Sequence, residues 1–320
     1  MKRIAILCSG GEASGMNPAL KRFVEYSYEL NLTPFFIYDG LNGLIDNNIK
    51  EASFKLVSGI ISRGGTIIRT SRSPRFKELE FREIAFENLK QHNITMLVIL
   101  GGDGTIRALD IFYKEFNIPF CAIPATIDND IFASSYSLGV DTALNSIKNS
   151  IDSIRDSASS FNRAFVIETM GRECGYLALI SAMTSGAEIC LIPEVEYDLE
   201  KIRTKALQQI KNGRTYFIAV VSEGIKQSSE EIALWFEKEL NIEARVTKLG
   251  HTQRGGNPTV YDRVMAYKFV TLAIDTLNSN HSSSVICFND SHFEYKSISE
   301  VSNQKNILDQ ELIEEAKKFN

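Results

Sequence analysis

Short apolar segments alternate along the chain with stretches in which apolar residues recur every three or four positions. Polar residues rarely interrupt the apolar segments, and uninterrupted runs of this kind are typical of strands that are covered on both faces. Strands that alternate with helices in this way form parallel sheets. We therefore predict strands at Arg3–Ser9, Thr33–Tyr38, Met96–Leu100, Phe120–Ile123, Ala164–Thr169, Ile189–Pro193, Phe217–Ser222, Ala244–Leu249 and Val285–Phe288.

The helical stretches carry start and stop signals. Asn17 stands before Pro18, which predicts an N-cap and a first helical residue for a helix that ends near Leu30. Asp141 and Asp198 are predicted to cap two further helices. Both halves of the chain show this alternation. The predicted fold class is therefore α/β, with two Rossmann-like three-layer domains, parallel-rich sheets and an active-site cleft between them.

A glycine-rich turn follows the predicted strand at Met96–Leu100 and reads Gly101-Gly102-Asp103-Gly104-Thr105. Ligands of parallel sheets bind at the carboxyl ends of the strands. Glycines there let backbone N–H groups approach phosphate oxygens, and a carboxylate at the apex of the turn is a suitable Mg²⁺ ligand. The turn predicts a phosphate site, although a structural turn can share this composition and lipid kinases and NAD kinases carry a similar GGDGT.

A second polar turn, Thr126-Ile127-Asp128-Asn129-Asp130, follows the predicted strand at Phe120–Ile123. Asp128 and Asp130 are two residues apart, which suits one general base and one metal ligand or supporting group. Asp and Asn are also frequent in capped turns, and neighbouring carboxylates repel unless a cation lies near. Together with Asp103, however, the turn indicates a catalytic site. A glycine turn, a metal-binding carboxylate and a carboxylate base are the parts that a phosphoryl-transfer enzyme needs.

Three further loops close predicted strands and carry candidate ligands. Ser9-Gly10-Gly11 ends the first strand, and Met170-Gly171-Arg172 follows the strand at Ala164–Thr169, where its glycine lets a substrate approach the backbone. The loop Gly250–Gly256 puts His251 and Arg254 on one glycine-rich segment. An imidazole and a guanidinium in that setting form a natural phosphate clamp.

The composition is that of an ordinary globular protein, with 44% hydrophobic and 23% charged residues among 320. This length favours two domains or one large α/β domain. The net charge of −5 argues against nucleic acid and anionic membranes as partners. It is compatible with an anionic substrate, because Arg72 and Arg75 flank Ser73 in a loop that faces solvent or reaches over a transferring phosphate.

The five cysteines are scattered, odd in number and form no Cys-x-x-Cys pair. We predict that they are free, buried thiols of a cytoplasmic protein. The apolar run near the N-terminus is too short for a signal peptide, and no run approaches the ~18 residues that a membrane span needs.

In this order, the motifs resemble those of the bacterial-type ATP-dependent 6-phosphofructokinases. The resemblance covers essentially the whole chain, from Ser9-Gly10-Gly11 through the turns at Gly101–Gly104 and Thr126–Asp130 to Met170-Gly171-Arg172 and His251–Gly256. No single motif is decisive, but the set with these spacings is specific. The resemblance implies a homotetramer that transfers the γ-phosphoryl group of ATP, with Mg²⁺, to the 1-hydroxyl of fructose 6-phosphate.

The resemblance also implies roles for individual residues. Asp128 is implied to be the base for the hydroxyl group, and Asp103 the Mg²⁺ ligand with Asp130 nearby. The other implied contacts are Gly11, Arg72, Ser73, Gly102, Gly104 and Thr105 for the nucleotide; Gly11, Arg72, Thr126 and Arg172 for the transferring phosphoryl group; Met170, Gly171 and Glu223 for the sugar; and His251 and Arg254 for the 6-phosphate, with Arg163 and Arg245 from a neighbouring subunit.

The same resemblance implies a nucleotide-binding domain of residues 1–139 and 253–304 and a smaller sugar-phosphate domain of residues 140–252 and 305–320. It further implies an inter-subunit effector site for ADP or phosphoenolpyruvate at Lys21, Arg155, Glu188 and Arg214. Glu25 departs from the family pattern there, since it replaces a second arginine and can pair with Lys21 along a helix. We therefore expect weak or absent regulation by these effectors. The first loop also departs from the family pattern at Glu12 and Ser14, and the predicted nucleotide pocket departs from it at Leu41, Arg107 and Ala108.

Three alternatives differ from this interpretation at particular residues. Pyrophosphate-dependent relatives carry Asp in place of Gly104 and Lys in place of Ala125, so the small residues here leave room for ATP. An NAD or lipid kinase shares only Gly101–Thr105 and does not account for the His251–Gly256 loop. A non-catalytic regulatory subunit usually loses the base or the metal carboxylate, whereas this chain keeps both.

Overall fold

The structure, a computed structural model, describes residues 1–279, 283–304 and 308–320. The chain forms two compact units, each built from two separate segments. Unit 1 comprises Met1–Thr142 and Arg254–Asn306, and unit 2 comprises Ala143–Gln253 and Ile307–Asn320. The chain returns from unit 1 to unit 2 at residues outside the described ranges. The domain boundary predicted between residues 304 and 305 adjoins the same residues.

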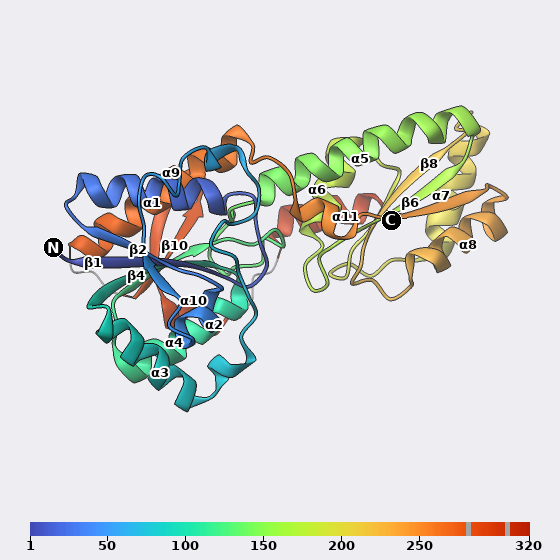
Figure 1. Ribbon diagram of the computed structural model, residues 1–320. Coiled ribbons are helices and arrows are strands. Elements are labelled where there is room, and N and C mark those ends of the chain that lie inside the picture. Colours follow the sequence, from blue (N-terminus) through green and yellow to red (C-terminus); the bar gives the residue numbers. More distant parts are fainter. Residues whose placement is uncertain (280–282, 305–307) are drawn as a thin grey trace. The chain divides into compact units, whose positions relative to one another are not determined.

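A mostly parallel sheet forms the middle layer of unit 1 (Figure 1). Its strand order is β11-β10-β5-β4-β1-β2-β3. Only the outer pairs β10/β11 and β2/β3 run antiparallel among the described strands. The strands are β1 (Arg3–Ser9), β2 (Thr33–Ile37), β3 (Ile49–Glu51), β4 (Ile94–Gly101), β5 (Phe120–Pro124), β10 (Ser284–Asn289) and β11 (His292–Ser297).

Helices cover both faces of this sheet (Figure 1). The helices α1 and α9 pack together on one face, and α2, α3, α4 and α10 cover the other. Ala5 and Leu7 of β1 belong to the core beneath the second group, while Ile4 and Ile6, which point the other way, are equally buried. The helical segments are α1 (Met16–Glu29), α2 (Gly40–Ile45), η1 (Ile60–Ser62), η2 (Pro74–Lys77), α3 (Leu79–Gln91), α4 (Asp103–Phe116), α9 (Val260–Asn278) and α10 (Ile298–Ser302).

Unit 2 is built on a parallel sheet in the order β7-β8-β6-β9. Side chains of α7 and α8 join one strand face in a common core, and α6 packs against β6, β7 and β8. The elements, of which α5 begins and η3 ends in unit 1, are α5 (Val140–Phe161), β6 (Ala164–Thr169), α6 (Tyr176–Ser185), β7 (Ile189–Leu191), α7 (Leu199–Lys211), β8 (Phe217–Ser222), α8 (Ser229–Leu240), β9 (Ala244–Lys248), η3 (Gly250–Arg254) and α11 (Gln310–Lys318).

The predicted α/β fold class with parallel-rich sheets is confirmed, and so is each predicted strand to within two residues at either end. The sequence pattern missed β3 and β11. Both are edge strands with mostly exposed or half-exposed residues, so neither carries an uninterrupted apolar run. The predicted cap at Asp198 is confirmed, because its carboxylate accepts hydrogen bonds from the backbone N–H groups of Glu200 and Lys201.

Two predicted caps are wrong. The first helix begins at Met16, so Asn17 lies inside it, buried, and its side-chain amide donates to the backbone oxygens of Arg63 and Gly64 at 3.1 and 3.0 Å. Asp141 likewise lies inside the first turn of α5, which begins at Val140. Buried Asp262 of α9 accepts hydrogen bonds there instead, including one of 2.7 Å from the Gly139 N–H.

All five cysteines are free and buried, as predicted. Burial raises the pKa of the Cys8 thiol to about 12 and that of Cys121 to about 11, so both stay protonated at neutral pH. Among the residues that the structure describes, no helix is both long and apolar enough to cross a membrane.

Candidate active site

The two predicted phosphate turns lie side by side in unit 1. Strands β1 and β4 are parallel neighbours, and Ser9 at the end of β1 pairs with Gly101 at the end of β4. The strand order changes direction here, because β2 lies beyond β1 and β5 lies beyond β4. Such a switch point is the usual ligand site of an open parallel sheet.

The glycine turn after β4 becomes the first turn of α4. Gly102 is the N-cap residue and Asp103 begins the helix. A Cβ atom on Gly101 would lie 2.7 Å from the side chain of Thr105, so a larger residue does not fit there. A Cβ on Gly104, in contrast, would meet no atom of the described residues within 4 Å. The open space lies at a positively polarised helix start, where phosphate oxygens are favoured.

Asp103, the predicted metal ligand, is half-buried and forms an ion pair with Arg107 one turn later, with 2.9 Å between Arg107 Nη2 and a carboxylate oxygen. Within the described ranges no group of three or more His, Cys, Asp and Glu side chains is placed to hold a metal ion. A lone carboxylate fits Mg²⁺ that is bound mainly by substrate phosphates and water. The donor set therefore suits a magnesium–nucleotide complex.

The Thr126–Asp130 turn stands beside the glycine turn. A Cβ on Gly102 would lie 3.4 Å from Thr126 Cβ. The Thr126 hydroxyl accepts a hydrogen bond of 3.3 Å from the backbone N–H of Asp128. Buried Asn129 adopts a left-handed conformation, with φ of 52°, and its side chain donates to the backbone oxygen of Ser135 at 2.9 Å. These contacts fix the turn that carries Asp128.

The surroundings of Asp128 suit a general base. Burial raises the pKa of its carboxyl group above the ordinary range, and the positive charges of Arg254 and Arg72 partly oppose that shift. A carboxylate with a raised pKa takes up a proton more readily than an ordinary aspartate, which is what proton abstraction from a hydroxyl group requires.

The arginines of unit 1 are placed by the turn after β1. Arg254 Nη1 lies 2.5 Å from where a Cβ of Gly11 would stand, so a larger residue there would displace the guanidinium group. The Arg72 loop is tied to the same turn, because Gly10 donates its N–H to the Ser71 oxygen at 3.2 Å. Unit 1 holds ten of the predicted active-site residues: Gly11, Arg72, Ser73, Gly102, Asp103, Gly104, Thr105, Thr126, Asp128 and Arg254.

In unit 2, three loops meet at the carboxyl edge of the sheet. Strand β6 lies between β8 and β9, and these strands lead respectively into Met170–Arg172, Glu223 and His251. The side chains of Arg172, Glu223 and His251 are exposed at this edge. Gly171 has a φ of 115°, and a Cβ there would lie 2.2 Å from the Cys174 backbone oxygen, so the glycine is required by the loop itself.

Arg163 and Arg245 lie at the opposite edge of that sheet. Arg163 immediately precedes β6, and Arg245 is the second residue of the parallel strand β9. Glu243 pairs with both guanidinium groups, at 2.6 Å from Arg163 Nε. The length of β6 separates these arginines from the loops at the carboxyl edge by about 17 Å. Unit 2 therefore does not bring them together with Arg172, Glu223 and His251.

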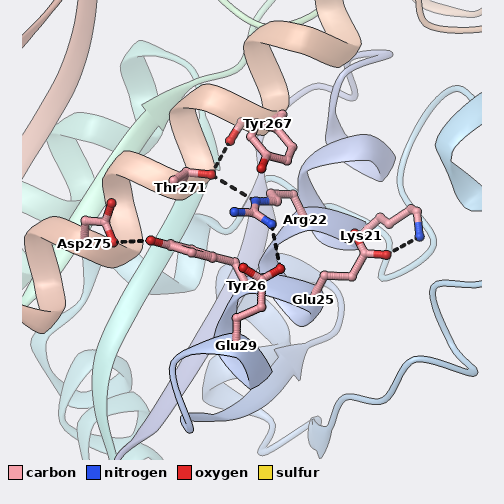
Figure 2. Close-up of polar contacts among 8 residues, drawn as sticks. All are labelled: Lys21, Arg22, Glu25, Tyr26, Glu29, Tyr267, Thr271 and Asp275. Carbon is pink, nitrogen blue, oxygen red and sulfur yellow. Dashed lines mark hydrogen bonds and ion pairs between the residues drawn. The ribbon is translucent and has the colours of Figure 1, made fainter.

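The predicted effector residues are already engaged in the structure. Figure 2 shows the ion pair between Lys21 and Glu25 on α1, which confirms the predicted pairing. In unit 2, Arg155 donates to the backbone oxygen of Ser185, and Arg214 pairs with Glu188. Glu188 is almost fully buried and also accepts a hydrogen bond of 2.7 Å from the Ile218 N–H.

Several residues at these loops were not predicted from the sequence. Glu243 joins two predicted arginines, and Arg107 pairs with the predicted metal ligand. Buried Ser222 and Gln253 contact the Met170–Arg172 loop. Gln253 lies within the motif that carries His251 and Arg254, and only this position in the sequence could have indicated its role. The other contacts depend on the packing of distant segments.

Comparisons with known proteins match nearly the whole chain. A family model described as phosphofructokinase matches residues 3–277. The chain is 61% identical over 319 residues to an ATP-dependent 6-phosphofructokinase of Sulfurimonas denitrificans, covering all of both chains. It is 51% identical over 301 residues to a protein of the same name from Wolinella succinogenes, covering 94% of each.

Solved structures show the same fold. Phosphofructokinase from Pichia pastoris in the T-state is 28% identical, with a TM-score of 0.91 over 99% of this chain; the match spans 39% of that longer chain. A pyrophosphate-dependent phosphofructokinase from Marinobacter aquaeolei is 17% identical, with a TM-score of 0.86, over all of this chain and 91% of the other. At that identity the second likeness concerns the fold alone.

Proposed function

The chain belongs to the phosphofructokinase family, and from this premise we propose that it transfers the γ-phosphoryl group of ATP to the 1-hydroxyl of fructose 6-phosphate. The products are fructose 1,6-bisphosphate and ADP. The observation that carries the proposal is the position of Asp128, whose carboxyl group has a raised pKa, faces two arginines and stands beside two phosphate turns. ATP is favoured over pyrophosphate because full-length relatives at 51% to 61% identity are named ATP-dependent enzymes.

Unit 1 is proposed to bind the nucleotide. The turns at Gly11 and Gly102–Thr105 offer backbone and open space to the phosphates, with the Arg72–Ser73 loop beside them. Asp103 is proposed to ligate Mg²⁺, which would neutralise charge on the transferred phosphoryl group and its neighbour. Arg107, which pairs with Asp103 in the structure, would then share that carboxylate with the metal.

The chemical step is proposed to use Asp128 as the base for the 1-hydroxyl of the sugar. Phosphoryl transfer passes through a loose transition state, so positioning and positive charge matter more than covalent help. Arg72, Arg172 and the Thr126 hydroxyl are proposed to contact the transferring group, because cationic donors stabilise the charge on its equatorial oxygens. Asp130 is proposed to support Asp128 from the same turn.

The sugar phosphate is proposed to bind through the loops at the carboxyl edge of unit 2. Met170, Gly171 and Glu223 would contact the sugar, while His251 and Arg254 would clamp the 6-phosphate. The proposed domain roles follow, with nucleotide binding at residues 1–139 and 253–304 and sugar-phosphate binding at residues 140–252 and 305–320.

Arg163 and Arg245 are proposed to reach the 6-phosphate of a second copy of the chain. Their place at the amino edge of the unit 2 sheet supports this assignment, because that edge is remote from the loops of their own unit. The active enzyme would then be an oligomer, and we propose a homotetramer. We also propose a cytoplasmic location, where both substrates occur.

The open space at Gly104 leads to a prediction about the phosphate donor. Gly104→Asp should raise the KM for ATP by about tenfold or more, since it places a second carboxylate beside Asp103 where phosphates bind. Gly104→Ala is the matched control, because alanine adds a Cβ without charge and suits a helix. Steady-state kinetics with varied ATP measures the effect; equal KM values for the two variants would contradict the assignment.

The effector positions lead to a second prediction. ADP activation and phosphoenolpyruvate inhibition should be weak or absent, because Lys21 is paired with Glu25 and an anion meets a carboxylate where an arginine would bind it. Saturation curves for fructose 6-phosphate, with and without each effector, measure this. A tenfold shift in half-saturation would contradict it, whereas Glu25→Arg should create a partial response.

The direct test of the proposed activity is a coupled assay of ADP formation or phosphate transfer. Fructose 6-phosphate and NAD are compared as acceptors, and ATP and pyrophosphate as donors. Activity confined to fructose 6-phosphate with ATP supports the proposal. Activity with pyrophosphate alone, or with NAD, would contradict it.

A further inference from the structure

Two buried polar side chains of unit 2 hold the Met170–Arg172 loop from opposite sides. The loop follows β6, the strand between β8 and β9. Gln253 reaches it from the segment after β9, and Ser222 reaches it from the end of β8. Both residues are at most 1% exposed, so neither side chain is available to a ligand.

Gln253 joins the loops after β6 and β9. Its side-chain oxygen accepts a hydrogen bond of 3.2 Å from the backbone N–H of Met170. Its side-chain nitrogen donates at 2.9 Å to the backbone oxygen of Gly250. One amide thus fixes the backbone beside Met170 relative to the segment that carries His251. A buried group that satisfies two backbone partners is costly to remove, because both partners are left without a hydrogen bond.

Ser222 joins the loops after β6 and β8. Its hydroxyl donates to the backbone oxygen of Gly171 at 2.5 Å and accepts from the Gly224 N–H at 3.2 Å. Gly224 packs closely on the same loop, since a Cβ there would lie 2.0 Å from the Arg172 oxygen. The backbone on either side of Glu223 is therefore set by the position of the Met170–Arg172 loop.

From these contacts we infer that Gln253 and Ser222 are positioning residues for sugar-phosphate binding. They act through backbone groups and hold three ligand-bearing loops, those of Arg172, Glu223 and His251, in one arrangement. The inference rests on the proposed function, because it takes these three loops as the sugar-phosphate site. A loop displaced by about 1 Å loses much of its binding or catalytic effect, so the contribution should appear in substrate binding.

The test compares Gln253→Met and Ser222→Ala with Ser181→Ala. Methionine is close in size to glutamine but satisfies neither backbone partner. Ser181 is a matched control, because it is a fully buried hydroxyl of the same unit with no hydrogen-bond partner among the described residues. We expect the first two variants to raise the KM for fructose 6-phosphate about tenfold, with the KM for ATP within about twofold of the unchanged protein.

The Gln253→Glu variant separates a positioning role from a purely structural one, because only a positioning role makes the KM for fructose 6-phosphate depend on pH in this variant. A protonated carboxyl group can donate to Gly250 and accept from Met170 as the amide does, whereas the ionised form turns a lone pair toward the Gly250 oxygen. The KM for fructose 6-phosphate, divided by that of the unchanged protein at each pH, should stay near one while this carboxyl group is protonated and rise once it is ionised. Burial raises the pKa of a carboxyl group, which brings the change toward neutral pH.

Two results would overturn the inference. The first is a lowered unfolding midpoint in Gln253→Met and Ser222→Ala without a change in KM. The second is a KM ratio for Gln253→Glu that stays near one at every pH, which decides the question even where Gln253→Met fails to fold. The unchanged protein is assayed alongside, and its failure to use fructose 6-phosphate would contradict the proposed function itself and this inference with it.

Discussion

Replacing Asp128 by asparagine is expected to lower kcat by at least ~100-fold, the usual contribution of a positioned general base. The amide keeps the shape of the side chain but cannot take the proton of the attacking hydroxyl group. The KM for fructose 6-phosphate should change much less, because the proposed phosphate clamp is intact. Steady-state kinetics with both substrates measures the changes in kcat and in KM separately. A variant with near-full kcat would show that Asp128 is not the base.

The raised pKa of Asp128 adds a pH dependence to this expectation. The base must be ionised, so kcat should fall as the pH drops through its pKa. Arg72 and Arg254 lower that pKa, so Arg72→Gln should move the acidic limb of the profile to higher pH. A pH profile of kcat for the two proteins measures the shift, and superimposable limbs would contradict the assignment.

The raised pKa of Asp128 also predicts how the free energy of unfolding depends on pH. The pKa of Asp128 is higher in the folded protein than in the unfolded chain, so the folded state binds the proton more tightly. Ionisation therefore costs stability as the pH rises through the folded pKa. Asp128→Asn removes that cost, and the variant should be more stable than the unchanged protein at neutral pH, with the difference vanishing in acid. Urea unfolding at several pH values measures it.

Arg245→Ala and Arg163→Ala are expected to raise the KM for fructose 6-phosphate by about 10- to 100-fold, since a phosphate loses a charge-assisted partner. Their place at the amino edge of the unit 2 sheet makes a sharper test possible. Chains carrying Asp128→Asn, mixed with chains carrying Arg245→Ala, should regain activity. A hybrid contains sites that combine an intact Asp128 from one chain with an intact Arg245 from another.

The hybrids are made by unfolding and reassembling the two variants together, and the controls are the two variants taken through this procedure separately. All are assayed with fructose 6-phosphate well below the KM of Arg245→Ala, where neither variant alone should gain activity. Glu243→Gln is a further variant of interest, because it frees both guanidinium groups from a shared carboxylate without removing either. No recovery in well-mixed hybrids would indicate that each site is completed within one chain.

The fold could be predicted where local pattern and burial agree. Strands β1, β6 and β8 were predicted residue for residue, because each is an uninterrupted apolar run that helices cover. The edge strands β3 and β11 could not be found, since their residues face solvent. The caps at Asn17 and Asp141 were wrong for a different reason. Contacts with residues distant in sequence engage the side chain of Asn17 and the first turn of α5, where Asp262 accepts from the Gly139 N–H.

The site could be predicted where a motif directly follows a buried strand. The turns at Gly101–Thr105 and Thr126–Asp130 stand at strand ends because their sequences place them there, and the structure sets them side by side. The charge pairing of Lys21 with Glu25 was equally local, since four residues make one helical turn. The contacts of Glu243, Ser222 and Gln253 were not predictable, because each joins segments that the chain order keeps apart.

The central claim is that this chain phosphorylates the 1-hydroxyl of fructose 6-phosphate with ATP as donor. Phosphorus NMR of the protein with MgATP and fructose 6-phosphate tests it most directly. The account predicts a second phosphate ester signal, coupled to the two protons on C1 of the sugar, that grows in step with the signals of ADP. Formation of ADP with inorganic phosphate and no new ester, or an ester that forms only when pyrophosphate replaces ATP, would contradict it.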